Sequence, residues 1–190
     1  MTFDPSQYND LTVTESAIPG LYVIKIPVHG DNRGWFKENY QKEKMEALGL
    51  PTFNVVQNNF SFNDKRGSTR GLHAEPWEKF ISVANGSVFG AWVDLRKGDS
   101  FGMVFSTEIN PGVAVFVPRG VANSYQTLED SITYTYLVNS HWSPTAEYAA
   151  VNLFDPEVGI DWPLGKDDAI VSEKDLGNPL LADVTPMEFN

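Results

Sequence analysis

Residues 67–86, GSTRGLHAEPWEKFISVANG, place one histidine, one arginine and one lysine close together in an otherwise acidic chain. The RGLH sequence within this stretch alternates polar and apolar residues, as a β-strand with one solvated face does. The alternation predicts that Arg70 and Leu72 face one side of the strand, while Gly71 and His73 face the other. The stretch therefore predicts a strand that carries a candidate functional histidine.

A break that contains proline separates this strand from a second one. The sequence EPWE at residues 75–78 interrupts the alternation, because proline cannot donate to a sheet ladder. The alternation resumes in KFISV at residues 79–83, and the NG pair at residues 85–86 predicts a hairpin turn. We expect His73 and Lys79, on adjoining strands, to point into the same cavity.

Short β-rich runs separated by turns continue through the rest of the chain and decide the fold class. They are VFGAWVDL at residues 88–95, MVFSTEI at 103–109, VAVFVP at 113–118, SYQTL at 124–128, SITYTYLV at 131–138 and YAAVNLF at 148–154. Regularly spaced short strands with glycine and proline between them are typical of a β-sandwich or barrel, not of alternating βαβ units. The sequence therefore predicts an all-β protein.

The remaining segments predict short peripheral elements around one core. A chain of 190 residues with 42% hydrophobic content is long enough for one buried domain over residues 1–190. Residues 1–20 are polar and predict an extended arm, not a packed element. Residues 41–48 predict a helix with a glycine cap, and about residues 155–190 form a C-terminal extension on the barrel with a short helix at 172–176.

The composition excludes several classes of function. The net charge of −11 and the pI of about 4.6 argue against sequence-independent nucleic-acid binding, which requires a basic face. The absence of cysteine excludes disulfide scaffolds, thiolate nucleophiles and thiolate zinc sites. The first ten residues lack the features of a secretory signal, and no apolar run approaches the length of a membrane span. We expect a cytoplasmic protein without membrane or nucleic-acid partners.

Two spacings resemble the motifs of metal-binding cupins, G(x5)HxH(x3-4)E(x6)G and G(x5)PxG(x2)H. The matching positions are Gly67, His73, Glu75, Lys79 and Gly86 for the first, and Gly112, Pro118, Gly120 and Asn123 for the second. The resemblance implies a cupin jelly-roll β-barrel, a double-stranded β-helix. Lysine in place of a carboxylate would repel a cation, and asparagine is a poor ligand for the metals that favour imidazole. We therefore expect no metal.

A longer series of blocks resembles the dTDP-4-dehydrorhamnose 3,5-epimerase family, which are metal-free cupins acting on nucleotide-linked deoxysugars. The blocks run in order through most of the chain: DNRG at residues 31–34 with Glu38, VQNNFS at 56–61, RGLH at 70–73, Lys79, VDLR at 93–96, PRG at 118–120, Tyr136, DP at 155–156, GIDWP at 159–163 and SEKD at 172–175. So many blocks in the same order identify the chain as a member of this family.

The resemblance implies roles for four catalytic residues. His73 would be the general base, held by Asp175, and Tyr136 would be the acid on the opposite face of the sugar. Lys79 would lie near the ketone oxygen. The residue types suit the reaction, because epimerisation beside a ketone needs a base on one face, a proton donor on the other and a cation at the developing enolate.

The resemblance also implies a set of binding residues and a dimer. Arg33 and Arg70 would contact the diphosphate of a dTDP-sugar, and some contacts would come from the neighbouring subunit of a homodimer. The other predicted substrate-binding residues are Glu38, Gln57, Asn59, Asn123, Trp142 and Lys174. The implied activity is inversion of C3 and C5 of dTDP-4-dehydro-6-deoxy-D-glucose to dTDP-4-dehydro-L-rhamnose, in dTDP-L-rhamnose or related deoxysugar biosynthesis, without a cofactor or a metal.

Two positions depart from the family pattern. Asn123 occupies the place of the usual histidine after the PxG turn, and His29 replaces an aromatic residue four positions before Arg33. The first departure affects a polar contact to the sugar, and the second affects how the base is stacked. Substrate detail can therefore differ while the acid and base remain.

Other functions and structural roles stay open at this point. The chain could invert one carbon only, act as a 3,4-ketoisomerase, bind a sugar nucleotide without catalysis, or be a metal-dependent oxygenase. Taken singly, His73 and Tyr136 fit structural or core roles, and Asp175 fits a capping-box position at a helix start. The arginines Arg33 and Arg70 could pair with surface carboxylates.

Overall fold

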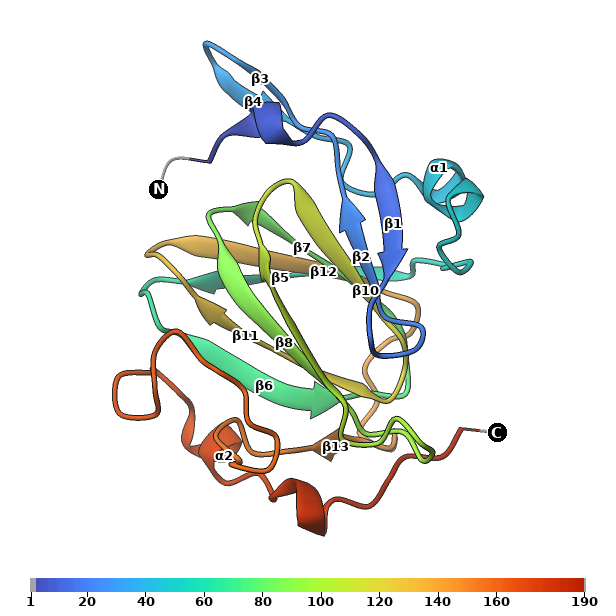
Figure 1. Cartoon of the computed structure of the whole chain (residues 1–190), viewed down its shortest axis with the longest axis vertical. Coiled ribbons are helices and arrows are strands. Elements are labelled where there is room, and N and C mark those ends of the chain that lie inside the picture. Colours follow the sequence, from blue (N-terminus) through green and yellow to red (C-terminus); the bar gives the residue numbers. More distant parts are fainter. Residues whose placement is uncertain (1–2, 190) are drawn as a thin grey trace.

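Two antiparallel sheets face each other in the computed structural model, which describes residues 3–189 (Figure 1). The six-stranded sheet has the order β1-β2-β10-β7-β12-β5. Its strands are β1 Thr12–Glu15, β2 Tyr22–Lys25, β5 Gln57–Asn63, β7 Lys79–Asn85, β10 Val113–Val117 and β12 Ile132–Val138. The five-stranded sheet has the order β13-β6-β11-β8-β9, with β6 Thr69–Ala74, β8 Val88–Asp94, β9 Val104–Ile109, β11 Val121–Thr127 and β13 Ala149–Ala150.

The remaining elements are small and lie outside the two sheets. The hairpin of β3 His29–Asp31 and β4 Gly34–Phe36 projects beyond the barrel at the top of Figure 1. The helices are α1 Lys42–Ala47 and α2 Glu173–Leu176, with 3-10 turns η1 Pro5–Gln7 and η2 Leu181–Asp183. This arrangement is the predicted all-β jelly roll with short helices. Within residues 3–189, no helix is long and apolar enough to cross a membrane.

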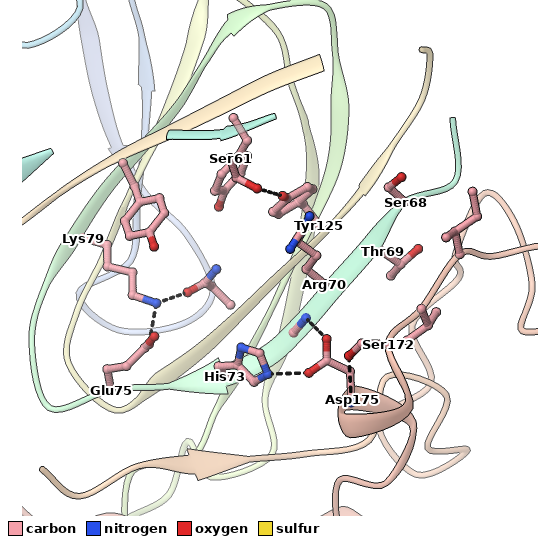
Figure 2. A pocket seen from close by; sticks show the side chains of 16 residues that line it. Ser61, Ser68, Thr69, Arg70, His73, Glu75, Lys79, Tyr125, Ser172 and Asp175 are labelled. Carbon is pink, nitrogen blue, oxygen red and sulfur yellow. Dashed lines mark hydrogen bonds and ion pairs between the residues drawn. The ribbon is translucent and has the colours of Figure 1, made fainter. Parts of the chain in front are cut away.

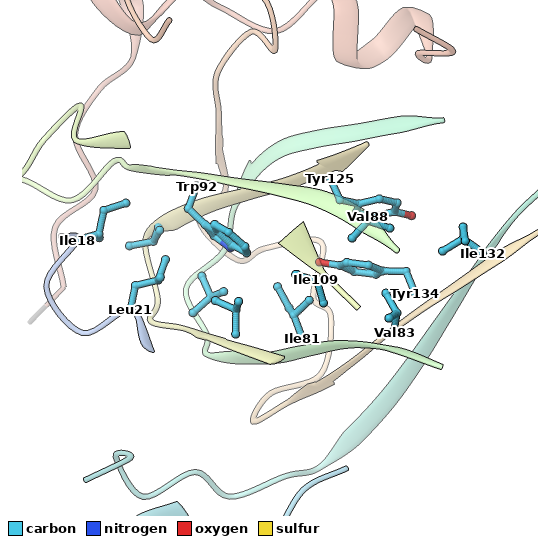
Figure 3. Close-up of a cluster of buried hydrophobic side chains, with 13 residues drawn as sticks. Ile18, Leu21, Ile81, Val83, Val88, Trp92, Ile109, Tyr125, Ile132 and Tyr134 are labelled. Carbon is cyan, nitrogen blue, oxygen red and sulfur yellow. The ribbon is translucent and has the colours of Figure 1, made fainter. Parts of the chain in front are cut away.

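Apolar side chains from both sheets fill one part of the space between them (Figure 3). The inward faces of β7 and β8 supply Ile81, Val83 and Trp92, all of which are buried. Tyr125 and Tyr134 stack with ring centroids 4.0 Å apart at the border of this cluster. Both tyrosines also line the cavity described below, so the core forms the rigid floor of the candidate site.

A second apolar cluster lies on the outer face of the five-stranded sheet. Leu72 and Val93 from the sheet pack with Val158, Leu181 and Met187 from the C-terminal segment. This segment runs from orange to red along the lower side of the barrel in Figure 1, beside β6 and β13. Burial of these side chains fixes the C-terminal segment against the strand that carries His73.

Strand β6 differs from the strict alternation that its sequence predicts. Arg70 and His73 both line the cavity, whereas Leu72 packs in the outer cluster, so the predicted pairing of Arg70 with Leu72 on one face is wrong. The cause is a register shift against β11, where His73 pairs with Asn123 but Arg70 pairs with Tyr125. Three steps along β6 oppose two steps along β11, which is a β-bulge that turns both polar side chains inward.

Glycine is required within this bulge. Gly71 has a φ of +122°, and a Cβ atom at this position would lie 2.6 Å from the backbone oxygen of Asn123. Any other residue would therefore push β6 away from β11. Gly71 therefore permits the close pairing of β6 with β11 beside His73.

Two further local predictions need correction. The NG pair at residues 85–86 does not close a hairpin, because β7 and β8 belong to different sheets and this turn carries the chain between them. The polar N-terminal arm contributes to the fold, since β1 pairs with β2 and the Ile18 side chain is fully buried.

Candidate active site

A cavity of about 500 Å³ opens between the two sheets (Figure 2). Both sheets and the segment that leads into α2 contribute to its wall, and most of its lining side chains are polar or charged. They include Ser61, Thr69, Arg70, His73, Glu75, Lys79, Asn123, Tyr125, Tyr134, Tyr136, Ser172 and Asp175. The cavity therefore brings together six of the predicted site residues: Arg70, His73, Lys79, Asn123, Tyr136 and Asp175.

His73 and Asp175 form a hydrogen-bonded pair at one side of this cavity. Nε2 of His73 lies 2.7 Å from Oδ1 of Asp175. The carboxylate is almost completely buried, with its side chain 8% exposed, while the His73 side chain is 40% exposed. An ionised carboxylate only accepts hydrogen bonds, so Nε2 of His73 carries the hydrogen and Nδ1 is left as the basic nitrogen. This arrangement suits a general base that is open to a ligand.

Helix α2 positions Asp175 through a cap at its first turn. The Ser172 hydroxyl oxygen accepts a hydrogen bond of 3.1 Å from the backbone N–H of Asp175. This is the capping contact that the SEKD sequence predicts, and it uses only the main chain of Asp175. The Asp175 side chain is free to reach His73 and also accepts a 3.5 Å hydrogen bond from the Gly71 N–H. Asp175 therefore takes part in the helix cap through its main chain and pairs with His73 through its side chain.

Lys79 approaches the cavity from the first position of β7, in the opposite sheet. Its side chain is only 7% exposed, and its ammonium forms an ion pair with Glu75. Nζ also donates a 2.5 Å hydrogen bond to Oδ1 of Asn123. Figure 2 shows the ammonium reaching toward the middle of the cavity, with Glu75 below it. A positive charge held here can stabilise a developing anion on a bound molecule.

Tyr136 lies on β12, also in the six-stranded sheet and therefore across the cavity from the β6 strand that carries His73. Burial raises the pKa of Tyr136, the negative charge of Glu75 and the neighbouring Tyr125 raise it further, and Arg70 lowers it. The Lys79 ammonium lies 5.8 Å from the centroid of the Tyr136 ring. A phenol with a raised pKa remains protonated and can donate a proton.

Arg70 is held by a small network that includes residues absent from the sequence-based site. Its Nε donates a 3.1 Å hydrogen bond to Oδ1 of Asn63, which also accepts from the Tyr125 hydroxyl at 3.1 Å. The Tyr125 hydroxyl lies 3.0 Å from Oγ of Ser61. The guanidinium keeps further donors for a ligand, and paired donors match the geometry of phosphate.

Six predicted binding residues are not among those that line this cavity. Arg33 is paired with Asp31 on the exposed β3–β4 hairpin, and Glu38 is paired with Lys44. Trp142 is 67% exposed. The other three are Gln57 and Asn59, whose side chains are hydrogen-bonded to each other on β5, and Lys174 on α2.

Ten of the sixteen lining residues were not among the predicted site residues, and Ser61, Glu75, Tyr125 and Tyr134 are among these ten. Glu75 could have been found, because it occupies the second histidine position of the cupin motif. Tyr134 could also have been found, since two-residue spacing places it on the same face as Tyr136. The position of Tyr125 depends on the bulge between β6 and β11, which the sequence pattern does not reveal. Within residues 3–189, no group of three or more His, Cys, Asp or Glu side chains could hold a metal ion.

The sequence pattern that defines the dTDP-4-dehydrorhamnose 3,5-epimerase family matches residues 15–183. The chain belongs to this family. The matched region includes β6, β7, β12 and α2, which position His73, Lys79, Tyr136 and Asp175.

Relatives of this epimerase-family chain support the assignment along most of its length. A Streptococcus pyogenes protein named as an RmlC homologue is 52% identical over 178 residues, covering 90% of this chain and 89% of that protein. RmlC from Streptococcus suis, solved in complex with dTDP-D-xylose, has a TM-score of 0.89 and 50% identity, covering 94% of this chain and 95% of that one. The 3,5-epimerase RmlC from Legionella pneumophila, solved with dTDP-4-keto-L-rhamnose, has a TM-score of 0.81 and 30% identity, with coverages of 91% and 94%.

Proposed function

We propose that this protein is a dTDP-4-dehydrorhamnose 3,5-epimerase, which inverts C3 and C5 of dTDP-4-dehydro-6-deoxy-D-glucose. One observation carries the proposal: His73 on β6 and Tyr136 on β12 line the same cavity from opposite sheets, with the Lys79 ammonium beside the tyrosine. A base and an acid on opposite sides of a ring are what inversion at carbon requires. The same pair can act at C3 and at C5, because both carbons adjoin the C4 ketone.

In the proposed reaction, Nδ1 of His73 removes the proton from the carbon beside the ketone. The electron pair of the broken C–H bond forms a double bond to C4, and the C=O π pair moves to the oxygen, giving an enolate that Lys79 stabilises. Collapse of the enolate draws a proton from the Tyr136 hydroxyl to the other face of the same carbon. The proton on His73 and the phenolate of Tyr136 then return to their starting states through solvent.

Electrostatics of the cavity support a nucleotide-linked substrate. The chain has a net charge of −11, so a diphosphate needs a local cation, and Arg70 supplies one within the cavity wall. The solved structures of RmlC with dTDP-D-xylose and with dTDP-4-keto-L-rhamnose contain ligands of this class. We therefore assign the diphosphate of a dTDP-sugar to Arg70.

A homodimer would account for the binding residues that lie outside the cavity of one chain. Phe60 and Phe62 point the same way from β5, an edge strand, and are 66% and 61% exposed. Two large exposed aromatic side chains on one strand favour contact with another protein surface. We propose that a second copy covers this face and that the exposed Arg33 and Glu38 serve the cavity of the partner subunit.

Proton exchange measures the proposed activity directly. Proton NMR of dTDP-4-dehydro-6-deoxy-D-glucose in deuterated buffer follows the C3 and C5 signals, and a 4-keto reductase captures the inverted product. Loss of both signals together with captured product supports the 3,5-epimerase. Loss of the C3 signal alone would identify a single-carbon epimerase, and no exchange would contradict the proposal.

A further inference from the structure

Glu75 forms the one acidic contact of the Lys79 ammonium among the described residues. The side chains of Lys79 and Glu75 are 7% and 16% exposed, so water screens their charges only weakly. The two residues are four positions apart, but a loop and not a helix joins them, since Glu75 follows β6 and Lys79 begins β7. The pair therefore spans the two strands that contribute His73 and Lys79.

The loop that carries Glu75 is fixed at both of its ends. The backbone oxygen of Glu75 accepts a 2.9 Å hydrogen bond from the N–H of Gly120. Further along, the Glu78 N–H donates to Oδ1 of Asn139 at 2.9 Å, and Nδ2 of Asn139 donates to the Glu78 carboxylate at 2.6 Å. These contacts fix the backbone of the loop at Glu75 and at Glu78, so the Glu75 side chain extends toward the ammonium from a fixed point.

The Lys79 ammonium has an ion-pair partner and a hydrogen-bond partner in this arrangement. Glu75 is the ion-pair partner, and Oδ1 of Asn123, on β11 across the cavity, accepts the hydrogen bond. An ammonium has three donors and no acceptor, so donors remain for a bound molecule. Both partners belong to the five-stranded sheet, because Glu75 follows β6 and Asn123 lies on the neighbouring β11, so they hold the ammonium from one side and leave its other side for a bound molecule.

We propose that Glu75 is a positioning residue that aims the Lys79 ammonium at the oxygen that becomes negatively charged during the reaction. The inference rests on the proposed epimerase function and adds a residue to it. Without Glu75, the long lysine side chain would regain rotational freedom, and its ammonium would spend less time at the reacting oxygen. Loss of the anchor should therefore lower kcat more than it changes KM.

Glu75 also affects the proton donor. The charged and titratable groups that share the cavity with Tyr136 are Glu75 from the β6–β7 loop, Lys79 from β7, Arg70 and His73 from β6, Tyr125 from β11, Asp175 from α2 and Tyr134 from its own strand. Among these, the negative charge of Glu75 raises the pKa of Tyr136. Its removal should lower that pKa, so that Tyr136 loses its proton and its activity at a lower pH.

The test compares Glu75→Gln with Glu188→Gln, which removes a similar lysine partner at the surface. Lys97 and Glu188 are 2.7 Å apart with side chains 67% and 65% exposed, far outside the cavity lining. We expect Glu75→Gln to lower kcat for C3 and C5 exchange by about 10- to 100-fold with KM changed less than about threefold. The alkaline limb of the pH–rate profile of Glu75→Gln should move to lower pH. Glu188→Gln should change neither kcat nor the pH–rate profile.

A second measurement does not depend on turnover. Reductive methylation with formaldehyde and a borohydride reagent, followed by peptide mass spectrometry, reports how freely each lysine amine reacts. We expect Lys79 to react several-fold faster in Glu75→Gln than in the wild type, with Lys97 unchanged. Equal labelling of Lys79 in both proteins would overturn the inference even if the wild type proved inactive on the proposed substrate.

A third variant guards against failure of folding. Glu75→Asp keeps the charge and shortens the side chain by one methylene, so it should retain the alkaline limb of the wild type while losing part of kcat. If Glu75→Gln and Glu75→Asp both keep the wild-type kcat, Glu75 has no positioning role. Exchange at C3 and C5 by the wild type, measured in parallel, separates this outcome from failure of the proposed function.

Discussion

Nε2 of His73 and Oδ1 of Asp175 lie 2.7 Å apart, although 102 positions separate the two residues in the chain. The contact joins β6 of the five-stranded sheet to the short C-terminal helix α2. Ser172 caps that helix through the main chain of Asp175, which leaves the carboxylate for the histidine. The cap and the pair can therefore be separated by mutation.

Asp175→Asn should lower the rate far more than the stability. An amide side chain can no longer hold the imidazole in the tautomer with Nδ1 unprotonated, so we expect kcat to fall by about 100-fold or more. The backbone N–H of Asp175 still bonds Ser172, so the helix start is kept. The measurements are steady-state exchange kinetics and urea unfolding of the same preparation.

Ser172→Ala is the matched comparison for the helix start. It removes the cap and should destabilise the protein by about 1 kcal/mol, with a smaller loss of kcat than Asp175→Asn. The reverse pattern, in which Asp175→Asn unfolds the protein easily but turns over normally, would assign Asp175 a capping role alone.

His73→Ala should abolish turnover and leave the fold intact. The His73 side chain is 40% exposed and contributes little to the apolar core, so its loss costs little stability. Removal of a general base lowers the rate by about 10²- to 10⁴-fold. Deuterium exchange at C3 and C5 should disappear together with inversion, and circular dichroism should remain that of the wild type. Unchanged exchange would remove His73 as the base.

Tyr136→Phe should separate exchange from inversion. The substitution keeps the ring and removes only the hydroxyl proton, so His73 can still take a proton and return deuterium to the same face. We expect exchange in deuterated buffer to persist while formation of inverted product falls by about 100-fold. Tyr134→Phe is the matched variant on the same strand and should retain inversion. Equal loss of exchange and inversion in Tyr136→Phe would indicate a role in binding.

Most of the fold follows from local sequence patterns, whereas the predicted site came from the resemblance to the epimerase family, and half of its residues line the cavity. Strand positions and the Ser172 cap are encoded by alternation, turn residues and capping preference, which act over a few residues. The pairing of β6 with β11 depends on a bulge, and the bulge brings Arg70 to the same side as His73. The sheet to which each strand belongs depends on packing between distant segments, so the NG pair could not be distinguished from a hairpin turn. Arg33 lies outside the cavity of its own chain, and only the proposed dimer would give it a place in a site.

Lys37 should make stability rise between neutral and alkaline pH. Burial lowers the pKa of Lys37 from its ordinary value of 10.5 to about 8 in the folded protein. Between these two values the unfolded chain binds more protons than the folded one, so the free energy of unfolding increases with pH. Lys37→Met should therefore be more stable than the wild type at neutral pH. The difference in the free energy of unfolding between the two proteins should shrink by about 2 kcal/mol between about pH 7 and about pH 10.

Urea unfolding at several pH values measures this difference, and Lys97→Met is the control. Lys97 is solvent-exposed and paired with Glu188, and this contact raises its pKa. The charge of Lys97 therefore does not destabilise the folded protein at neutral pH, and Lys97→Met should not be more stable than the wild type there. A constant difference between Lys37→Met and the wild type across the range would show that Lys37 titrates normally.

Substitution of Phe60 and Phe62 together by serine should shift the protein from dimer to monomer. Both rings are more than half exposed on one face of the edge strand β5, and the proposed second copy would bury them. The control is Leu180→Ser, an apolar side chain 46% exposed near the C-terminus. Analytical ultracentrifugation gives the mass of each variant.

Because the proposed partner subunit contributes Arg33 and Glu38, KM for the dTDP-sugar should rise as the dimer dissociates, while the cavity that contains His73 stays folded. A monomeric wild type would exclude the proposed subunit contact. A dimer that persists after loss of both rings would place the contact elsewhere.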